Sequence, residues 1–273
     1  MRRAEYRANA ASKLGLLLSL LPKHSGEFRD RLHNFFEERY ERFRFRPSPR
    51  ATIGFDELIR LLNESFDWDL AGALRERALE HVESYLGTLA FSVCANGPFA
   101  SSHNADLELA RFCYAACRVL SPKFVVETGV AYGITTCFVL RALGENKQGR
   151  LWSLDLPPLT PKADQSTGLL VPRDLRGIWT LQRGASRRRL PELLRRLGSV
   201  DLFIHDSLHT YANMTWEFQT VWPYLRAGGV LISDDVDGHS AFSDFVSQVG
   251  PSVSAVVAEK GKRAAFGVLV KPQ

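Results

Sequence analysis

Acidic residues and glycines gather in a few short segments, each directly after a run of apolar residues. The first segment, residues 124–136 (Phe-Val-Val-Glu-Thr-Gly-Val-Ala-Tyr-Gly-Ile-Thr-Thr), predicts a buried strand, a glycine turn and the first turn of a helix. Unpaired backbone N–H groups and a positive dipole end lie at such a helix start and favour an anionic group. Glu127, at the strand end, would instead repel a pyrophosphate and accept hydrogen bonds from an ammonium group. The segment therefore favours a ligand that carries both a carboxylate and an ammonium.

The glycine spacing separates this turn from a dinucleotide site. Gly129 and Gly133 are spaced G-x-x-x-G, whereas dinucleotide-binding turns carry G-x-G-x-x-G. A nucleoside with an ammonium and a carboxylate is S-adenosylmethionine, which we expect here; an ordinary glycine turn of an α/β protein is the alternative. Thr135 offers a hydroxyl at the helix start. Asp155, 28 residues after Glu127, is placed to accept hydrogen bonds from both ribose hydroxyls.

Small and acidic residues follow the later strands. Ala185 and Ser186 leave room for an adenine edge. Asp206, and Asp234 with Asp235, would crowd together, because the carboxyl ends of parallel strands meet at one edge of a sheet. Like charges at that distance are costly without a cation, and carboxylate oxygens suit Mg²⁺. We expect a divalent-cation site; the alternative is that one or two of these aspartates cap helices.

His209 follows Asp206 by three residues and is the expected catalytic base. A hydroxyl bound to a metal ion is acidified, and a neutral imidazole near pH 7 can accept its proton. A structural histidine in a loop is the alternative. His205 is a weaker candidate and is expected to pack at a strand end.

Strands and helices alternate in the second half of the chain, which predicts a doubly wound, Rossmann-like α/β sheet. Five parallel strands are expected at residues 123–127, 151–155, 178–183, 200–205 and 228–233. Two more, at residues 252–259 and 263–270, would form a C-terminal antiparallel hairpin and bring the sheet to seven strands.

Residues 1–100 show helical periods and no convincing strand. We therefore expect two parts, an α-helical N-terminal region over residues 1–100 and a cofactor-binding domain over residues 101–273. The N-terminal region would form a lid, a dimerisation surface that makes the protein a homo-oligomer, or a packing extension.

The composition is that of a globular chain of 273 residues, with 45% hydrophobic and 24% charged residues. No apolar run reaches the roughly 18 residues that a membrane span requires, and four cysteines without a C-x-x-C pair indicate free thiols. We expect a cytoplasmic protein without membrane contact. Arginines gather in residues 29–50 and 173–196, which predicts solvated helix faces or a site for an anionic substrate; no nucleic-acid-binding module is recognisable.

These motifs together resemble those of class I S-adenosylmethionine-dependent methyltransferases. Within that class they are similar to the metal-dependent small-molecule O-methyltransferases of the catechol and macrolide-sugar kinds. The segments 206–211 (Asp-Ser-Leu-His-Thr-Tyr) and 222–235 resemble the bacterial branch that includes cephalosporin hydroxylase-like proteins. The resemblance covers about residues 100–270.

The resemblance implies S-adenosylmethionine and Mg²⁺ as cofactors and a small-molecule acceptor. It implies that His209 and Asp206 are catalytic and that Asp206, Asp234 and Asp235 bind the metal ion. The implied cofactor-binding residues are Glu127, Gly129, Tyr132, Gly133, Thr135, Asp155, Ala185, Ser186 and Asp206. The catechol enzymes carry lysine in place of His209 and asparagine in place of Asp235, which shifts the expected acceptor toward sugar or other natural-product hydroxyls.

Two other functions stay open on the sequence. One is a hydroxylase-like metalloenzyme on the same sheet, in which a transition metal carries the reaction. The other is a non-catalytic protein that binds a nucleoside or an anionic ligand.

Overall fold

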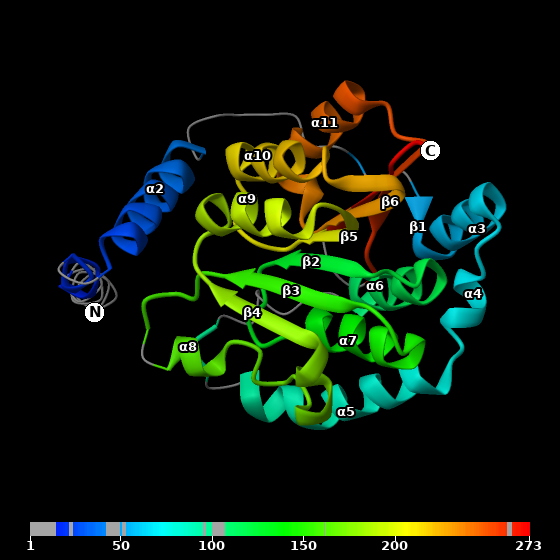
Figure 1. Ribbon diagram of the computed structural model, residues 1–273, viewed down its shortest axis with the longest axis horizontal. Helices are drawn as coiled ribbons and strands as arrows, with labels where there is room; N and C mark the ends of the chain where they lie inside the picture. The colour runs from blue at the N-terminus through cyan, green and yellow to red at the C-terminus, as the bar shows by residue number, and fades with distance from the viewer. Residues whose placement is uncertain are drawn as a thin grey trace.

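The computed structural model describes residues 15–21, 24–41, 50, 53–94, 97–99, 107–160, 162–260 and 264–273. An eight-stranded sheet lies at its centre (Figure 1). The strands are β1 (Ile53–Gly54), β2 (Phe124–Thr128), β3 (Arg150–Asp155), β4 (Trp179–Arg183), β5 (Val200–His205), β6 (Leu225–Ser233), β7 (Val253–Ala258) and β8 (Ala265–Val270).

The order of the strands across the sheet is β1-β7-β8-β6-β5-β2-β3-β4. Strands β4, β3, β2, β5 and β6 run parallel to one another. Strand β8 is antiparallel to both of its neighbours, β6 and β7. The Rossmann-like fold and its antiparallel C-terminal hairpin are thus confirmed. The expected strand count was too low by one, because β1 lies in the segment expected to be helical and pairs with β7. Two residues are too short to show the alternation that marks a strand.

Helices cover both faces of the sheet. They are α2 (Ser25–Glu41), α3 (Phe55–Phe66), α4 (Leu70–Ala73), α5 (Arg77–Cys94), α6 (Leu107–Leu120), α7 (Ile134–Asn146), α8 (Ala163–Ser166), α9 (Ser186–Leu197), α10 (Tyr211–Val221) and α11 (Ala241–Val249), with short 3-10 turns η2 (Arg173–Ile178) and η3 (Val236–Gly238). In the described part of the chain, no helix is both long and apolar enough to cross a bilayer.

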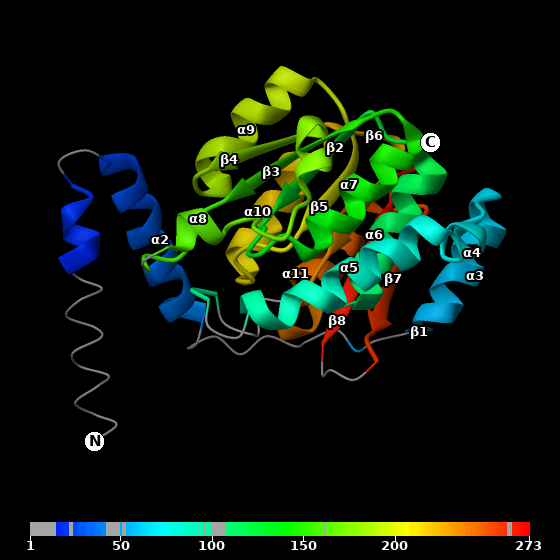
Figure 2. The same ribbon diagram turned by 90° about the horizontal axis from the view of Figure 1, so that it is seen from below.

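Alternate residues of the central strands supply two cores. Val125 packs with the residues of α3, α5, α6 and α7 on one face of the sheet, whereas Val126 packs with α9, α10 and α11 on the other (Figures 1 and 2). Burial on both faces explains why the central strands read as continuous apolar runs. The sheet is therefore a rigid base from which the loops at its carboxyl edge project.

Helix α2 lies apart from α3, α4 and α5, beside α9 and α10 (Figure 1). Its acidic residues form ion pairs with the arginine-rich segment: Glu27 with Arg183, Asp30 with Arg188 (2.8 Å) and Glu37 with Arg187 (3.2 Å). Three arginines of that segment therefore have partners within the same chain. This weakens the case for the segment as a site for an anionic substrate.

Candidate active site

The residues that follow the central strands lie side by side because the strands end in register. Thr128 of β2 pairs with His205 of β5, and His205 pairs with Ser233 of β6. The next backbone N–H groups extend this ladder, since Asp206 N donates to Thr128 O (2.8 Å) and Asp234 N donates to His205 O (2.9 Å). The predicted convergence of the loops after β2, β5 and β6 is therefore present in the structure.

The glycine turn after β2 requires glycine at two positions. Gly129 (φ 85°) and Gly133 (φ 90°) adopt left-handed backbone conformations. A Cβ on Gly129 would lie 1.7 Å from the carbonyl oxygen of Asp206. The turn therefore touches the loop that carries Asp206, and a larger residue would push the two apart.

Thr135 and Asp155 flank this turn. Thr135 is 4% exposed, and its buried hydroxyl takes no hydrogen bond within the described residues. Such an orphaned group at a helix start fits an absent anionic ligand. Asp155 Oδ2 accepts hydrogen bonds from the backbone N–H groups of Val130 and Ala131 (both 3.0 Å). Burial raises the pKa of Asp155 to about 6 although these bonds oppose the rise.

Glu127 is buried at 1% exposure and has hydroxyl partners inside the fold. Thr136 donates to both of its oxygens (3.1 and 2.9 Å), and Ser153 Oγ donates to Oε2 (2.6 Å). Trp179 Nε1 in turn donates to Ser153 Oγ (2.8 Å). Burial raises the pKa of Glu127 to about 7 against these hydrogen bonds. The carboxylate thus braces β2 against α7 and β3, and its contact with a ligand ammonium stays a prediction.

The structure places the ring of Tyr132 in the hydrophobic core, and its expected contact with the cofactor stays a prediction. Its ring packs edge-on against Phe99, with centroids 4.9 Å apart, and its hydroxyl lies 3.5 Å from the Phe99 carbonyl oxygen. Side-chain direction inside a tight turn depends on backbone angles that the residue pattern does not reveal.

Ala185 is buried where α9 begins, and Ser186 is the first residue of that helix.

Asp206, His209 and Asp234 form a cluster after β5 and β6, at the same carboxyl edge of the sheet. Each offers one ligand atom, and these atoms lie within 4.8 Å of one another. Burial raises the pKa of Asp206 well above its usual range, and the neighbouring charges of Asp234, Glu127 and Asp235 raise it further. Crowded carboxylates beside an imidazole fit a divalent cation that would neutralise them.

Asp235 differs from its expected place in this cluster. Its carboxylate Oδ2 lies 3.1 Å from His209 Nδ1, while its backbone is left-handed (φ 48°) at the start of η3. Asp235 therefore orients the His209 ring, and His209 takes the third position of the cluster. The Nε2 atom of His209 is buried without a hydrogen bond within the described residues and lies 3.8 Å from Asp206 Oδ1. Although burial opposes it, the hydrogen bond with Asp235 raises the pKa of His209.

Sequence reasoning missed Glu217, a fully buried acidic residue on α10. It contacts His205, whose Nδ1 lies 2.7 Å from Glu217 Oε2. Burial lowers the pKa of His205, which is consistent with a neutral ring that donates its Nδ1–H. Burial alone would raise the pKa of Glu217, but His205 and the hydroxyl donors around it lower that pKa to about 2. The signal in the sequence was a glutamate at helical spacing from the apolar residues Met214 and Val221.

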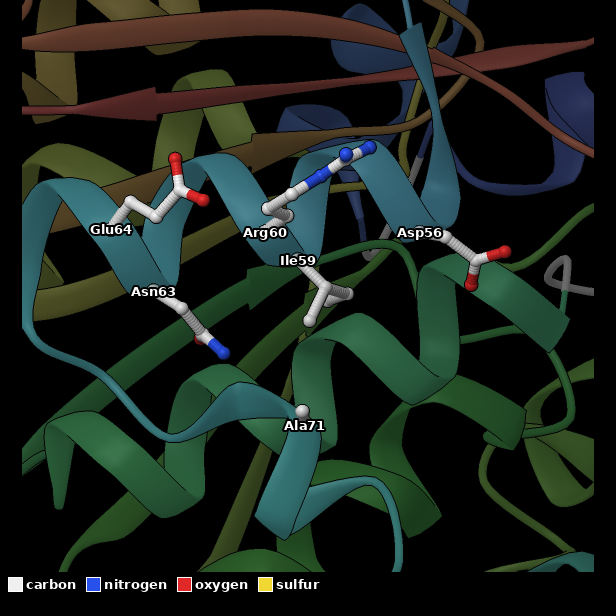
Figure 3. Close-up of a pocket in the computed structure, with 6 residues that line it drawn as sticks. All are labelled: Asp56, Ile59, Arg60, Asn63, Glu64 and Ala71. Carbon is white, nitrogen blue, oxygen red and sulfur yellow. The ribbon is translucent and has the colours of Figure 1, made fainter.

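A hollow elsewhere on the surface does not compete with this site. Figure 3 shows it on α3 and α4, lined by Asp56, Ile59, Arg60, Asn63, Glu64 and Ala71. It lies at the opposite end of the molecule from α2 and α8 (Figures 1 and 2). No cluster of metal-ligating atoms is found there among the described residues. The converging groups lie at the carboxyl edge instead.

Comparison with known proteins agrees with the geometry. Residues 126–236 match a family described as "Methyltransferase domain", and the match spans the strands that carry the glycine turn and the acidic cluster. This part of the chain is therefore similar to a methyltransferase domain. No curated protein sequence matches the chain.

Solved structures with the same fold include two O-methyltransferases. The enzyme from Bacillus cereus, in complex with SAH, is 14% identical with a TM-score of 0.51; the match covers 79% of this chain and 97% of that one. TomG from Streptomyces achromogenes, involved in tomaymycin synthesis and in complex with SAM, is 15% identical with a TM-score of 0.52, covering 72% of this chain and 91% of that one. At these identities the likeness shows the fold alone, the Rossmann-like sheet that this chain shares with both structures.

Proposed function

We propose that the protein is an S-adenosylmethionine-dependent O-methyltransferase that uses a divalent cation, Mg²⁺, to methylate the hydroxyl of a small molecule or sugar. One observation carries this proposal: the glycine turn with its orphaned Thr135 hydroxyl lies against the loop of the Asp206, His209 and Asp234 cluster. A methyl donor and a metal-bound acceptor would thus share one sheet edge. Binding both reactants there converts a bimolecular displacement into an effectively intramolecular one.

The glycine turn and its neighbours would bind the methyl donor. The Thr135 hydroxyl and the start of α7 suit the carboxylate of the methionine part, and Asp155 suits the ribose hydroxyls. Gly129 and Gly133 let the backbone approach the ligand closely, and Ala185 and Ser186 border the adenine. Glu127, at the end of β2, and Asp206, whose backbone carbonyl lies against Gly129, are the two carboxylates proposed for the ammonium group.

The acidic cluster would bind the metal ion through Asp206 and Asp234 and activate the acceptor. A divalent cation bound there would lower the pKa of the acceptor hydroxyl. His209, oriented by Asp235, accepts the hydroxyl proton on Nε2. The acceptor oxygen then forms a bond to the methyl carbon as the carbon–sulfur bond of the donor breaks, so the products are a methyl ether and the neutral thioether.

Calorimetry with S-adenosylmethionine, S-adenosylhomocysteine and NAD tests the cofactor. We expect the first two to bind and NAD not to bind. A methyl-transfer assay on a panel of sugar and phenolic acceptors, with Mg²⁺ and with excess chelator, tests the reaction. Binding of NAD alone would refute the methyl donor, and full turnover in chelator would refute the metal. Cofactor affinity without turnover on any acceptor would favour a binding protein.

A hydroxylase-like metalloenzyme is the second candidate, because His209 is among the clustered ligand atoms and an imidazole suits transition metals. Oxygen uptake in the presence of Fe²⁺, with no methyl transfer, would favour it.

A homo-oligomer formed through the N-terminal helices is also proposed. Six of the nine exposed large apolar side chains of the described residues lie between residues 15 and 41: Leu16, Leu18, Leu21, Phe35, Phe36 and Tyr40. Light scattering of the full chain and of a Phe35→Ser/Phe36→Ser variant tests it. A monomeric wild-type protein would rule it out.

A further inference from the structure

Glu217 lies beneath the loop that carries Asp206 and His209. We propose that Glu217 is a positioning residue that fixes this loop, and with it the base and one metal ligand, in the geometry that catalysis needs. This inference rests on the proposed function above for its kinetic consequences, while the ordering of the loop can be measured without any reaction.

Glu217 receives hydrogen bonds from the ends of two strands, from the loop and from its own helix α10. The donors are Thr128 Oγ1 at the end of β2 (2.6 Å), His205 Nδ1 at the end of β5 (2.7 Å), Ser207 Oγ in the loop (2.8 Å) and Asn213 Nδ2 on α10 (3.1 Å). A carboxylate can accept about four such bonds, so its capacity is filled. One side chain thereby ties two strand ends, a loop and a helix together.

The loop itself is secured through two of these donors. Ser207 directly follows Asp206, and Asn213 also donates to the backbone oxygen of Leu208 (3.0 Å) and to Ser207 Oγ (3.3 Å). The carboxylate of Glu217 thus fixes the residues between Asp206 and His209.

His205 extends the same network to the ring of the proposed base. Its imidazole packs edge-on against that of His209, with ring centroids 5.3 Å apart. Because Glu217 accepts a hydrogen bond from Nδ1 of His205, it also fixes the orientation of the His205 ring, which packs against His209. A displacement of about 1 Å at a reacting group can cost about 10²-fold in rate, so the support of a base matters as much as its identity.

The test variant is Glu217→Gln, which keeps the size of the side chain and places an N–H₂ group among donors that need an acceptor. We expect kcat to fall about 10–100-fold, as for other outer residues that orient a metal site. The Kd for S-adenosylmethionine should change much less than kcat, because Thr135 and Asp155, assigned to the methionine carboxylate and the ribose, make no hydrogen bond to Glu217. Amide hydrogen exchange in residues 206–210 should become faster.

Glu76→Gln is the matched control. Glu76 accepts hydrogen bonds from Tyr114 (2.5 Å) and Arg118 (2.7 Å) on α6, outside the site. The Glu76→Gln variant should have a lower free energy of unfolding. Its kcat and the amide hydrogen exchange of its residues 206–210 should be those of the wild type. Ser207→Ala removes the hydrogen bonds of the Ser207 hydroxyl with Glu217 and Asn213 and should give a smaller loss of kcat. This variant still tests the inference if Glu217→Gln does not fold.

Wild-type kcat and wild-type loop exchange in Glu217→Gln and Ser207→Ala would overturn the inference, as would an equal loss of kcat in Glu76→Gln. If the wild-type protein transfers no methyl group, the proposed function fails. The positioning role is then decided by the exchange of residues 206–210 and by Mn²⁺ affinity, both measured without an acceptor.

Discussion

Along the carboxyl edge of the sheet, the acidic residues after β2 and β3 have surroundings opposite to those of the acidic residues after β5 and β6. In the half formed by β2 and β3, Glu127 accepts hydroxyl hydrogen bonds and Asp155 accepts two backbone N–H groups. In the half formed by β5 and β6, Asp206 has Asp234 and Asp235 as charged neighbours, and every cause that acts on its pKa raises it. The carboxylates of the first half have hydrogen-bond donors within the fold, whereas those of the second half form a local excess of negative charge.

This difference indicates which acidic residues stabilise the fold and which are candidates for binding a ligand. A buried carboxylate supplied with donors braces the elements that supply them. Carboxylates that lie close together repel one another, which destabilises the fold unless a cation neutralises them. The acidic residues at one sheet edge therefore have two roles, although they occupy equivalent positions at the strand ends.

Replacing Asp234 by alanine should give the largest effect. The variant removes a ligand from the half with excess charge and leaves the glycine turn intact, so we expect Mg²⁺-dependent turnover to be abolished and the Kd for S-adenosylmethionine to be nearly unchanged. Methyl-transfer rates and calorimetry measure the two quantities. Full activity in this variant would remove the metal from the mechanism.

Replacing His209 by glutamine should lower kcat about 10²–10⁴-fold, the usual contribution of a positioned general base. Asp235→Asn is the companion variant. It removes the charge that orients Nδ1 (3.1 Å), so its effect should be smaller and in the same direction. A larger loss for Asp235→Asn than for His209→Gln would instead indicate that Asp235 is a metal ligand, as the sequence predicted.

Two single substitutions should change the stability of the metal-free protein in opposite directions. Ser153→Ala takes a donor (2.6 Å) from buried Glu127 and should lower the free energy of unfolding by about 1–3 kcal/mol. Asp206→Asn relieves repulsion in the other half and should raise that free energy. Urea unfolding in chelator measures both. Destabilisation by Asp206→Asn as large as that by Ser153→Ala would contradict the comparison.

The stability of the metal-free protein should fall as the pH rises from about 5 to 8. Folding raises the pKa of Glu127 from 4.5 to about 7 and that of Asp155 from 3.8 to about 6, so the folded state binds more protons in this range. Their contribution is present below the unfolded pKa and is lost as the pH passes the folded one. Glu27 and Glu217, whose pKa values are lowered to about 2, act only below about pH 4.5. Urea unfolding in chelator at pH 5 and pH 8 checks the sign, and greater stability at pH 8 would contradict it.

Much of this fold could be predicted because burial on both faces leaves a direct trace in the sequence. Apolar runs followed by Gly129, Asp155, Asp206 and Asp234 gave the strands, their ends and therefore the edge at which side chains meet. The two-residue strand β1 left no such trace, since its pairing with β7 depends on tertiary contact.

Details of the site depended on side-chain direction, which residue spacing does not determine. Tyr132 lies in a turn, where backbone angles direct it into the core. Asp235 has a left-handed backbone that places its carboxylate beside His209. The role of Glu217 shows only through its donors, which come from two strand ends, the loop and its own helix.

A crystal structure with S-adenosylhomocysteine and Mn²⁺ tests the central claim most directly, because Mn²⁺ is located by its anomalous scattering. We predict one anomalous peak within ligand distance of Asp206 and Asp234, with the carboxylate of the ligand at Thr135 and its ribose at Asp155. A peak at Glu127 or no peak at this edge, or a ligand bound away from the glycine turn, would contradict the account.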